Sequence, residues 1–370
     1  MMESVALHNF KAFARVELQL APMTLLSGLN ASGKSTVLQA LAVLRQSHED
    51  GTLAEDGLLL NGELIELGTG HDVLYEDYET GEGGPRIGVT VREAGLEYGW
   101  SGTYGYEQDL LPLADRPEHP VEQLSLFQRG FQYLHANRIV PAVHYPKSHR
   151  IAIRRGFLGV RGEHTVNYLR IHQDDPLART PVLHPEERSP SLLDQVNAWM
   201  RELCPGVNLQ ADDLQDTDFV RLRFGFFGTA GIRSTNRYRP TNVGFGLTYT
   251  LPVVVACLTA QPGSLVMLEN PEAHLHPRGQ TMMGRLAALA ASTGAQVLVE
   301  THSEHVLNAT RLAVKDGDIP PSMVALHYFH RRDDGAISVT TPVIGRDGMI
   351  SDWPEGFFDE WDRSLDRLLT

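Results

Sequence analysis

A short loop near the N-terminus constrains the fold more than any other feature of this sequence. Residues 28–35 read Gly-Leu-Asn-Ala-Ser-Gly-Lys-Ser, after an apolar run at 23–27 and before apolar residues at helical spacing over 34–46. Strand, glycine-containing loop and helix are the context in which this pattern holds the phosphates of a nucleotide. A turn that only caps a helix is the alternative, and the flanking segments argue against it. The sequence therefore predicts a nucleotide-binding α/β core.

Each residue type in this loop has a chemical reason. Backbone N–H groups must converge on phosphate oxygens, and Gly33 allows the backbone to approach closely. Lys34 brings a positive charge to the outer phosphates, the Ser35 hydroxyl is a ligand for magnesium, and the following helix presents its positive end. The residues predicted to bind the nucleotide here are Gly28, Asn30, Ala31, Ser32, Gly33, Lys34, Ser35 and Thr36.

Magnesium bound at such a loop needs a carboxylate from the end of a neighbouring strand. The apolar run 265–268 ends in Glu269, and a second run, 296–299, is followed three residues later by His302. Apolar runs alternate with helical patterns in this half of the chain, which is typical of a doubly wound sheet. We therefore predict that Ser35 and Glu269 hold Mg²⁺.

The composition of the chain limits the partners and the cellular location that we expect for it. The 32 Lys and Arg against 46 Asp and Glu give a formal net charge of −14, so binding to a polyanion needs a local basic surface. No apolar run reaches the roughly 18 residues that cross a bilayer, and the N-terminus lacks the apolar core of a secretory signal. Two cysteines cannot form a disulfide framework or a four-cysteine zinc site. We expect a cytoplasmic protein that makes no membrane contact.

Five segments together resemble the ABC-type ATPases, and within them the OLD-like (overcoming lysogenization defect) and SMC-like AAA group. Residues 5–13 are similar to the first strand and turn of that group, 241–248 to its signature, and 269–277 to its extended Walker B segment. Residues 300–303 resemble its switch-histidine segment. Residues 353–359 are similar to an uncharacterised C-terminal domain that is common in bacterial defence-associated ATPases.

The resemblance implies an α/β fold, a P-loop NTPase of the ABC-ATPase type with a mixed sheet, flanking helices and a long inserted subdomain. The core would comprise residues 1–50, with the Walker A loop, and 240–345, with the signature-like, Walker B and switch-histidine motifs. Residues 51–239 would form a β-rich and helical insertion or lid, and 346–370 an aromatic and acidic docking segment. Within the insertion, residues 123–134 are expected to form a helix.

The resemblance further implies a head-to-tail homodimer that encloses ATP and Mg²⁺. Each ATP would lie between the phosphate loop of one subunit and the signature of the other, where Asn242, Gly244 and Gly246 would contact it. His302 would contact the γ-phosphate. Because no output chemistry is visible in the chain, the ATPase is expected to control a separately encoded effector, and family analogy places it in bacterial anti-phage defence.

One position departs from the family pattern. Asn270 stands where a catalytic glutamate usually follows the metal carboxylate. An amide can orient an attacking water but cannot accept its proton at neutral pH. Two interpretations stay open: hydrolysis is slow, or Glu272 in the same loop acts as the general base.

Four histidines near these motifs suggest a metal site as an alternative. His274, His276, His302 and His305 lie close in sequence, but their order does not match the His-Glu-x-x-His pattern of zinc hydrolases. We favour a phosphate-sensing role for His302 and loop or cap positions for His274 and His276.

Basic residues gather between Arg138 and Arg161, interleaved with aromatic residues, a mixture that can bind nucleic-acid backbones and stack bases. A solvated face or internal salt bridges with the abundant acids is the other interpretation, and the one we favour. Three functions therefore stay open. They are an ATPase that controls an effector, a DNA-metabolism ATPase related to the SMC-like group, and an ATP-gated scaffold with little hydrolysis.

Overall fold

The computed structural model describes residues 1–370 except 79–83, 179, 227–235, 333–334, 354–359 and 370, and the side chains of 360–364 are also not described. Its central sheet has the strand order β15-β14-β3-β13-β12-β8. Neighbouring strands run parallel except at β15, which pairs antiparallel with β14. The strands are β3 (Met23–Gly28), β8 (Gln132–Leu134), β12 (Leu265–Glu269), β13 (Gln296–Thr301), β14 (Val324–Arg331) and β15 (Ile337–Thr340).

The middle strands of this sheet are apolar on both faces, as strands covered on both sides must be. In β3, Leu25 joins the core on one face and Leu26 joins the core on the other. In β13, Val297 and Val299 lie in the first core and Leu298 in the second. Because β3, β12, β13 and β14 run parallel, they end at one common edge of the sheet, and the loops that follow them meet there.

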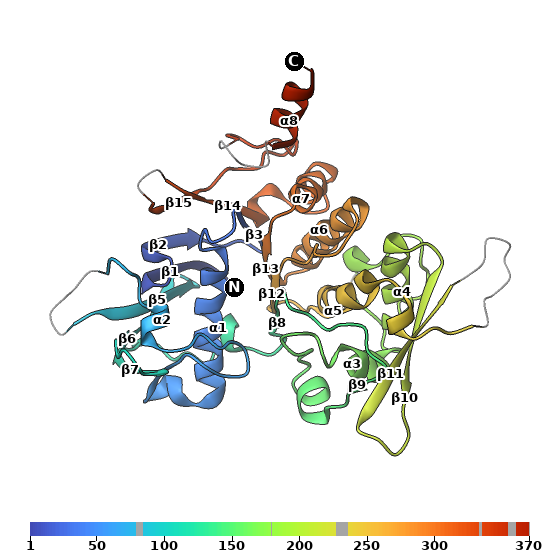
Figure 1. Ribbon diagram of the computed structural model, residues 1–370, viewed down its shortest axis with the longest axis horizontal. Coiled ribbons are helices and arrows are strands. Elements are labelled where there is room, and N and C mark those ends of the chain that lie inside the picture. Colours follow the sequence, from blue (N-terminus) through green and yellow to red (C-terminus); the bar gives the residue numbers. More distant parts are fainter. Residues whose placement is uncertain (79–83, 179, 227–235, 333–334, 354–359, 370) are drawn as a thin grey trace.

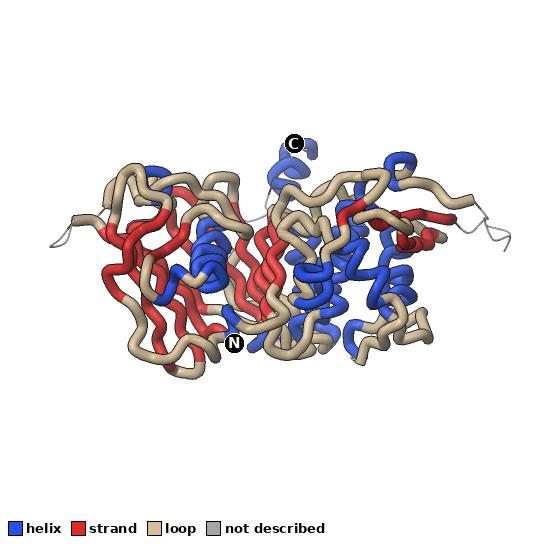
Figure 2. Tube along the Cα trace, turned by 90° about the horizontal axis from the view of Figure 1, so that it is seen from below, coloured by secondary structure: helices blue, strands red, loops and turns tan. Residues whose placement is uncertain are grey.

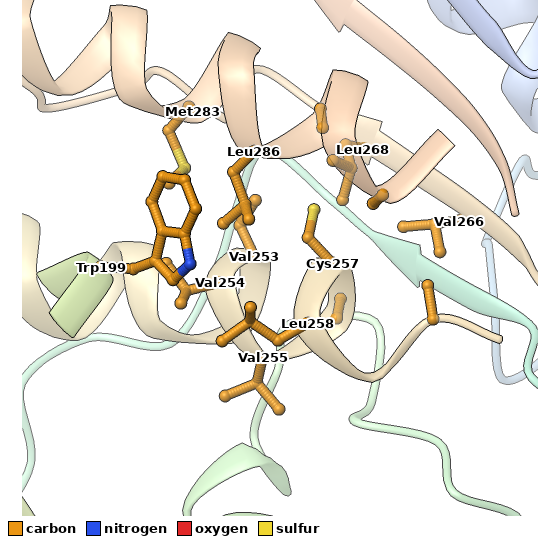
Figure 3. Packing of buried hydrophobic residues seen from close by; sticks show 14 of the residues in the cluster. Trp199, Val253, Val254, Val255, Cys257, Leu258, Val266, Leu268, Met283 and Leu286 are labelled. Carbon is orange, nitrogen blue, oxygen red and sulfur yellow. The ribbon is translucent and has the colours of Figure 1, made fainter. Parts of the chain in front are cut away.

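Helices cover both faces of the central sheet (Figure 1). α1 (Lys34–Asp50) packs on one face, and α5 (Phe245–Thr259) and α6 (Pro277–Ser292) pack on the other. α7 (Glu304–Asp316) lies beside α6. Every residue of α5 from Leu247 to Leu258 is buried, and Figure 3 shows Cys257 among side chains of the sheet and of α6. A helix that is apolar all round is one that the fold encloses.

A second sheet, which is antiparallel, lies on the far side of α1 (Figures 1 and 2). Its strand order is β2-β1-β5-β6-β7-β4, and the short helix α2 (Gly70–Val73) lies near it. The turn between β1 and β2 brings Lys11 and Ala12 beside the phosphate loop. The strands are β1 (Met2–Phe10), β2 (Phe13–Gln19), β4 (Gly57–Leu59), β5 (Arg86–Glu93), β6 (Leu96–Thr103) and β7 (Leu110–Asp115).

The opposite end of the molecule consists of helices and a small sheet next to α5 (Figure 1). The helices are α3 (Thr165–His172) and α4 (Leu192–Leu203). Residues 51–239 therefore contribute to three regions, because β4–β7 join the N-terminal sheet, β8 joins the central sheet, and α3, α4 and β9–β11 form this end. The small sheet contains β9 (Tyr145–Pro146), β10 (Val207–Asp213) and β11 (Phe219–Phe226).

One local expectation needs correction. The helix predicted for residues 123–134 is wrong, because the segment forms a short turn at Ser125–Phe127 and then β8. β8 is a strand because it pairs with β12, and pairing with a distant segment is not visible in local sequence. Pro252 lies in the middle of α5. Its ring packs so closely on Gly162 that a Cβ there would lie 2.4 Å away.

The C-terminal helix α8 (Glu360–Leu369) projects from the body (Figure 1). Its leucines Leu365, Leu368 and Leu369 are exposed. Phe357, Phe358 and the Trp361 side chain of the predicted docking segment lie outside the described residues. In the part of the chain that the structure describes, no helix is long and apolar enough to cross a membrane.

Candidate nucleotide-binding site

The phosphate loop connects β3 to α1, as the sequence predicts, and its shape depends on two glycines. Gly28 has φ +146°, and a Cβ there would lie 2.1 Å from the Phe329 carbonyl oxygen of the neighbouring strand β14. Gly33 has φ +89°, and a Cβ there would lie 2.6 Å from the Phe13 ring. Residues with side chains cannot occupy these positions without moving β14 or the β1–β2 turn. The loop is therefore held against both sheets.

A cavity of about 650 Å³, which we call the phosphate cavity, opens over this loop. Of the predicted site residues, it contains those of the loop after Leu29, together with Asn270 and His302. Gly28, Glu269 and Glu272 are not among the residues that line it. The lining residues are Lys11, Ala12, Asn30, Ala31, Ser32, Gly33, Lys34, Ser35, Thr36, Gln39, Asp72, Leu74, Glu76, Asn270, Glu300 and His302.

Lys34 reaches back along the loop. Its Nζ donates a hydrogen bond to the Leu29 carbonyl at 2.6 Å and lies 3.5 Å from Ser32 Oγ. Burial lowers the pKa of Lys34, and the charge of nearby Glu300 opposes that shift. The ammonium group is thus held among oxygens at the floor of the cavity, where a phosphate group would meet it.

Glu300 is a site residue that the sequence argument did not assign. The Ser35 hydroxyl donates a hydrogen bond to Glu300 Oε1 at 2.8 Å, because β13 lies directly beside β3. Burial raises the pKa of Glu300 to about 7, and the Ser35 hydrogen bond opposes the increase. Glu300 Oε2 is buried and has no hydrogen-bond partner among the described residues.

Two further buried oxygens in this region also lack hydrogen-bond partners within the described chain, Asn270 Oδ1 and Glu272 Oε2. Unpartnered buried oxygens are costly unless water or a cation satisfies them. Hydroxyl and carboxylate oxygens are also the ligands that magnesium prefers. Ser35, Glu300 and Asn270 at the cavity therefore fit a hydrated magnesium ion.

Glu269, the predicted metal carboxylate, lies one strand further from the loop than Glu300. Its carboxylate accepts hydrogen bonds from the Tyr133 hydroxyl and, at 3.0 Å, from the Ala136 N–H. It lines an adjoining cavity of about 570 Å³, and Gln39 of α1 lines both this cavity and the phosphate cavity. Glu269 thus stands behind the phosphate cavity in this structure.

Asn270 and Glu272 have different surroundings. Asn270 has φ +44°, a left-handed conformation that turns the chain sharply after β12, and it lines the phosphate cavity. Glu272 is 6% exposed, and its Oε1 accepts the His302 N–H at 2.9 Å. Burial raises the pKa of Glu272. In this conformation Glu272 supports the backbone of His302, and His302 itself lines the phosphate cavity.

Arg138 is a second residue whose role was not predicted from the sequence, where it was counted only as one of the basic residues between Arg138 and Arg161. Its side chain is 0% exposed, and its guanidinium donates to the carbonyls of Glu269 at 2.8 Å and Asn270 at 2.7 Å. The same group lies 4.3 Å from the centre of the Tyr249 ring on α5. Burial lowers the pKa of Arg138 to about 10. Arg138 ties the end of β12 to the helix that follows the signature.

The rest of the predicted basic cluster is partly neutralised. Lys147 pairs with Asp213 at 2.6 Å, and Arg155 pairs with Glu49 at 2.7 Å and Glu63 at 2.8 Å. Arg150, Arg154 and Arg161 are exposed. DNA binding by this region therefore stays a prediction that rests on these three arginines.

The signature segment lines a second cavity, also of about 650 Å³, which we call the signature cavity. Asn242, Gly244 and Gly246 lie at its wall, and the loop before α6 contributes His274 and His276. Phe245, between the two glycines, is 38% exposed, and its ring contacts Tyr249 and His274. The lining residues are Glu202, Leu203, Cys204, Pro205, Phe226, Tyr238, Asn242, Val243, Gly244, Gly246, Leu247, His274, Leu275, His276, Arg278 and Gly279.

The histidines do not converge on a metal. Among the described residues no three His, Cys, Asp or Glu side chains are placed to hold one ion. His276 is the N-cap of α6, and its Nδ1 accepts the Arg278 N–H at 3.4 Å. His274 packs edge-on against Phe245 and Tyr249.

Comparisons of sequence find ATPase families in two segments. Residues 166–308 match a family described as "AAA domain, putative AbiEii toxin, Type IV TA system", and residues 1–72 match one described as "AAA ATPase domain". Residues 319–368 match a "Protein of unknown function (DUF3696)" family. No curated protein matches the chain.

Comparisons of structure find the head domains of SMC proteins. One is an SMC head bound to the C-terminal winged-helix domain of ScpA, with a TM-score of 0.53 and 14% identity over 93% of this chain and 98% of that one. Another is an SMC head with an extended coiled coil bound to the C-terminal domain of ScpA, derived from Pyrococcus furiosus. Its TM-score is 0.52, with 12% identity over 100% of this chain and 99% of that one. The chain therefore has the fold of an SMC head, with a phosphate loop after β3, and residues 1–72 and 166–308 are similar to AAA ATPase families.

Proposed function

We propose that this chain binds and slowly hydrolyses ATP in a head-to-tail homodimer and thereby controls a separately encoded effector protein. One observation carries the proposal: the loop 270–276 lines both the phosphate cavity and the signature cavity. The two cavities therefore open at the same edge of the sheet, yet this loop keeps them apart within one chain. A second copy, turned by a two-fold axis, brings each phosphate cavity opposite a signature.

ATP would be held mainly by the phosphate loop. The N–H groups of the loop and the N-terminus of α1 would bind phosphate oxygens, and Lys34 would leave the Leu29 carbonyl for the outer phosphates. Ser35 and Glu300 would hold Mg²⁺ at the cavity, with Glu269 behind them as the predicted partner carboxylate. When bound, the ion supplies positive charge that offsets charge on the phosphates. His302 lines the same cavity and would contact the γ-phosphate.

Slow turnover is expected from the groups beside the attacking water. Asn270 can orient a water through its side-chain amide but cannot take its proton. Glu272 stays a candidate general base, but its carboxylate accepts the His302 N–H and does not line the cavity. Loop 270–276 must therefore shift before Glu272 can act, which favours an ATP-bound state of long lifetime.

Control of an effector is proposed because the described residues hold no second catalytic cluster besides this site. The matched AbiEii-like family name mentions a toxin of a type IV toxin–antitoxin system, which is consistent with a role in defence. The exposed leucines of α8 offer a surface for the effector. Defence against phage rests on family analogy.

The decisive experiment measures phosphate release and molar mass for the purified chain with Mg²⁺, with and without ATP. We expect ATP to convert monomer to dimer, and turnover to be lost in Lys34→Ala. A monomer at all ATP concentrations, or full turnover in Lys34→Ala, contradicts the proposal.

An ATP-gated scaffold is the second candidate, and Asn270 favours it. It predicts dimerisation on ATP without measurable phosphate release. A DNA-metabolism role would instead require salt-sensitive binding of duplex DNA that is lost when Arg150 and Arg154 are both replaced by Ala.

A further inference from the structure

We propose that Leu29 of each subunit inserts into the signature cavity of the other and anchors the dimer. This inference rests on the proposed head-to-tail dimer and adds the residue that joins its two halves. Two features support it: an exposed leucine in the phosphate loop and a mostly apolar cavity at the signature segment.

Leu29 is 64% exposed, although it lies between the buried strand β3 and the nucleotide-binding part of the loop. The neighbouring Gly28 packs on the Phe329 carbonyl of β14, a contact that does not depend on Lys34. The side chain is therefore held outward by a well-supported backbone. An exposed leucine is common on protein surfaces, but one at the mouth of a nucleotide site will lie in the interface if ATP is enclosed between subunits.

The signature cavity offers a matching apolar surface. Six of its lining side chains are apolar, and they come from the end of α4 and the turn after it, from β11, from the signature segment and from the loop before α6. Its volume of about 650 Å³ leaves room for a leucine and part of the loop that carries it. The six are Leu203, Pro205, Phe226, Val243, Leu247 and Leu275.

Charges at the two mouths are complementary. Asp72 and Glu76, both exposed, line the phosphate cavity. Arg239, two residues before the signature segment, is exposed and forms no ion pair within the described chain, whereas Arg278 of the signature cavity is paired with Glu202 at 2.9 Å. Opposite charges at facing rims favour a second copy of this chain over an uncharged small molecule as the occupant.

A two-fold axis uses each contact twice. If Leu29 of one subunit enters the cavity of the partner, the partner's own leucine enters the cavity of the first subunit. The dimer thus buries two leucines beside two nucleotides. ATP and Leu29 would then both lie in the dimer interface. The apolar contact of Leu29 would add to the stability of a dimer whose geometry is set by the bound ATP.

The chain offers a direct test, because it has two cysteines and one of them lines this cavity. Cys204 is partly exposed in the signature cavity, whereas Cys257 is fully buried. In a Leu29→Cys variant, a short bismaleimide should link the new thiol to Cys204 of the partner. We expect covalent dimer in the presence of ATP and Mg²⁺, and very little of it without nucleotide.

Three controls define the result. Leu29→Cys combined with Cys204→Ser should give no covalent dimer, and neither should the unmodified chain. Leu96→Cys, at a leucine that is 40% exposed on β6, should not link to Cys204. Light scattering on each sample reports whether a non-covalent dimer has formed before the reagent is added.

The outcomes separate this inference from the proposed function. An ATP-dependent dimer by light scattering without any Leu29→Cys to Cys204 link overturns the Leu29 contact and leaves the ATP dimer standing. No dimer under any nucleotide condition overturns both. As a second measurement, Leu29→Asp should raise the dimer dissociation constant about 100-fold, since two apolar contacts are lost. An unchanged dissociation constant contradicts the inference.

Discussion

The two cavities at the edge of the central sheet have the same volume, about 650 Å³, and opposite chemistry. The phosphate cavity is lined by lysines, carboxylates, hydroxyls and backbone amides, whereas the signature cavity is lined chiefly by aliphatic and aromatic side chains. The first can hold the charge of a nucleotide but has little apolar surface, whereas in the second the Arg278 guanidinium is already paired with Glu202 at 2.9 Å. The phosphate cavity lacks apolar surface, which the signature cavity has, and the signature cavity lacks a phosphate-binding loop, which the phosphate cavity has. We therefore treat the two cavities as halves of one site between two subunits.

The strongest test of this comparison removes the charge of the phosphate cavity. Lys34→Ala takes away the buried ammonium, and we expect ATP affinity to fall about 100-fold or more, because an unpaired phosphate charge is costly to bury. Calorimetric titration with ATP and Mg²⁺ measures the effect. Lys315→Ala, an exposed lysine of α7, is the matched control and should bind ATP normally. Wild-type affinity in Lys34→Ala would show that the cavity is not the nucleotide site.

The parts of this site that were predictable from sequence are those set by neighbours in the chain. The strand, loop and helix from Met23 to Asp50 are specified locally, and all three form as expected. Glu300 was not assigned because its role depends on sheet order. β13 lies between β3 and β12, so Glu300 reaches Ser35 while Glu269 is one strand away.

The burial of Arg138 also depends on residues that are distant in the sequence. An arginine in a polar-looking segment is usually at the surface. This one is buried because carbonyls from residues 269 and 270, more than a hundred positions later, complete its hydrogen bonds. Three-residue β8 is likewise a strand only through its pairing with β12. Long-range partners of this kind leave no local pattern.

The next test compares two carboxylates close to the phosphate cavity. Glu300→Gln keeps the shape of the side chain but removes a charge beside Ser35, and we expect turnover to fall about 10- to 100-fold. Glu272→Gln should cost less than about tenfold, because its carbonyl oxygen can still accept the His302 N–H.

Phosphate release at saturating ATP, measured over a range of Mg²⁺ concentrations, distinguishes the two. Only Glu300→Gln should require more Mg²⁺ for half-maximal rate. If Glu272→Gln abolishes turnover while Glu300→Gln does not, then Glu272 is the general base and loop 270–276 moves on binding ATP.

The signature cavity is tested by adding a methyl group to a glycine. A Cβ at Gly244 would meet no atom within 4 Å in the chain, and its φ of −56° suits any residue. Gly244→Ala should therefore leave the melting temperature unchanged. If the partner's nucleotide packs on this glycine, turnover should nevertheless fall about tenfold through misplacement of the bound phosphate.

Gly246→Ala sharpens that result. A Cβ there would lie 3.1 Å from the His274 carbonyl, so it disturbs the loop within one chain as well as any contact between chains. We expect it to lower both the melting temperature and turnover. Equal, wild-type turnover in both variants would place the signature away from any nucleotide.

The smallest expected effect concerns the link between the two cavities inside one chain. The Arg138 guanidinium lies over the Tyr249 ring and binds the Asn270 carbonyl, so it connects the signature helix with the wall of the phosphate cavity. Tyr249→Leu keeps an apolar side chain in the core but removes the ring. We expect the free energy of unfolding to fall by about 1–2 kcal/mol, through loss of the cation–π contact at a buried site. Turnover should fall about threefold with ATP affinity unchanged, because Asn270 loses a supporting contact while the contacts of the phosphate loop remain.

Tyr249→Phe retains the ring and should match the wild type in urea unfolding and in phosphate release. If Tyr249→Leu lowers stability but leaves turnover intact, the stack is structural only, and the two cavities communicate solely across the dimer.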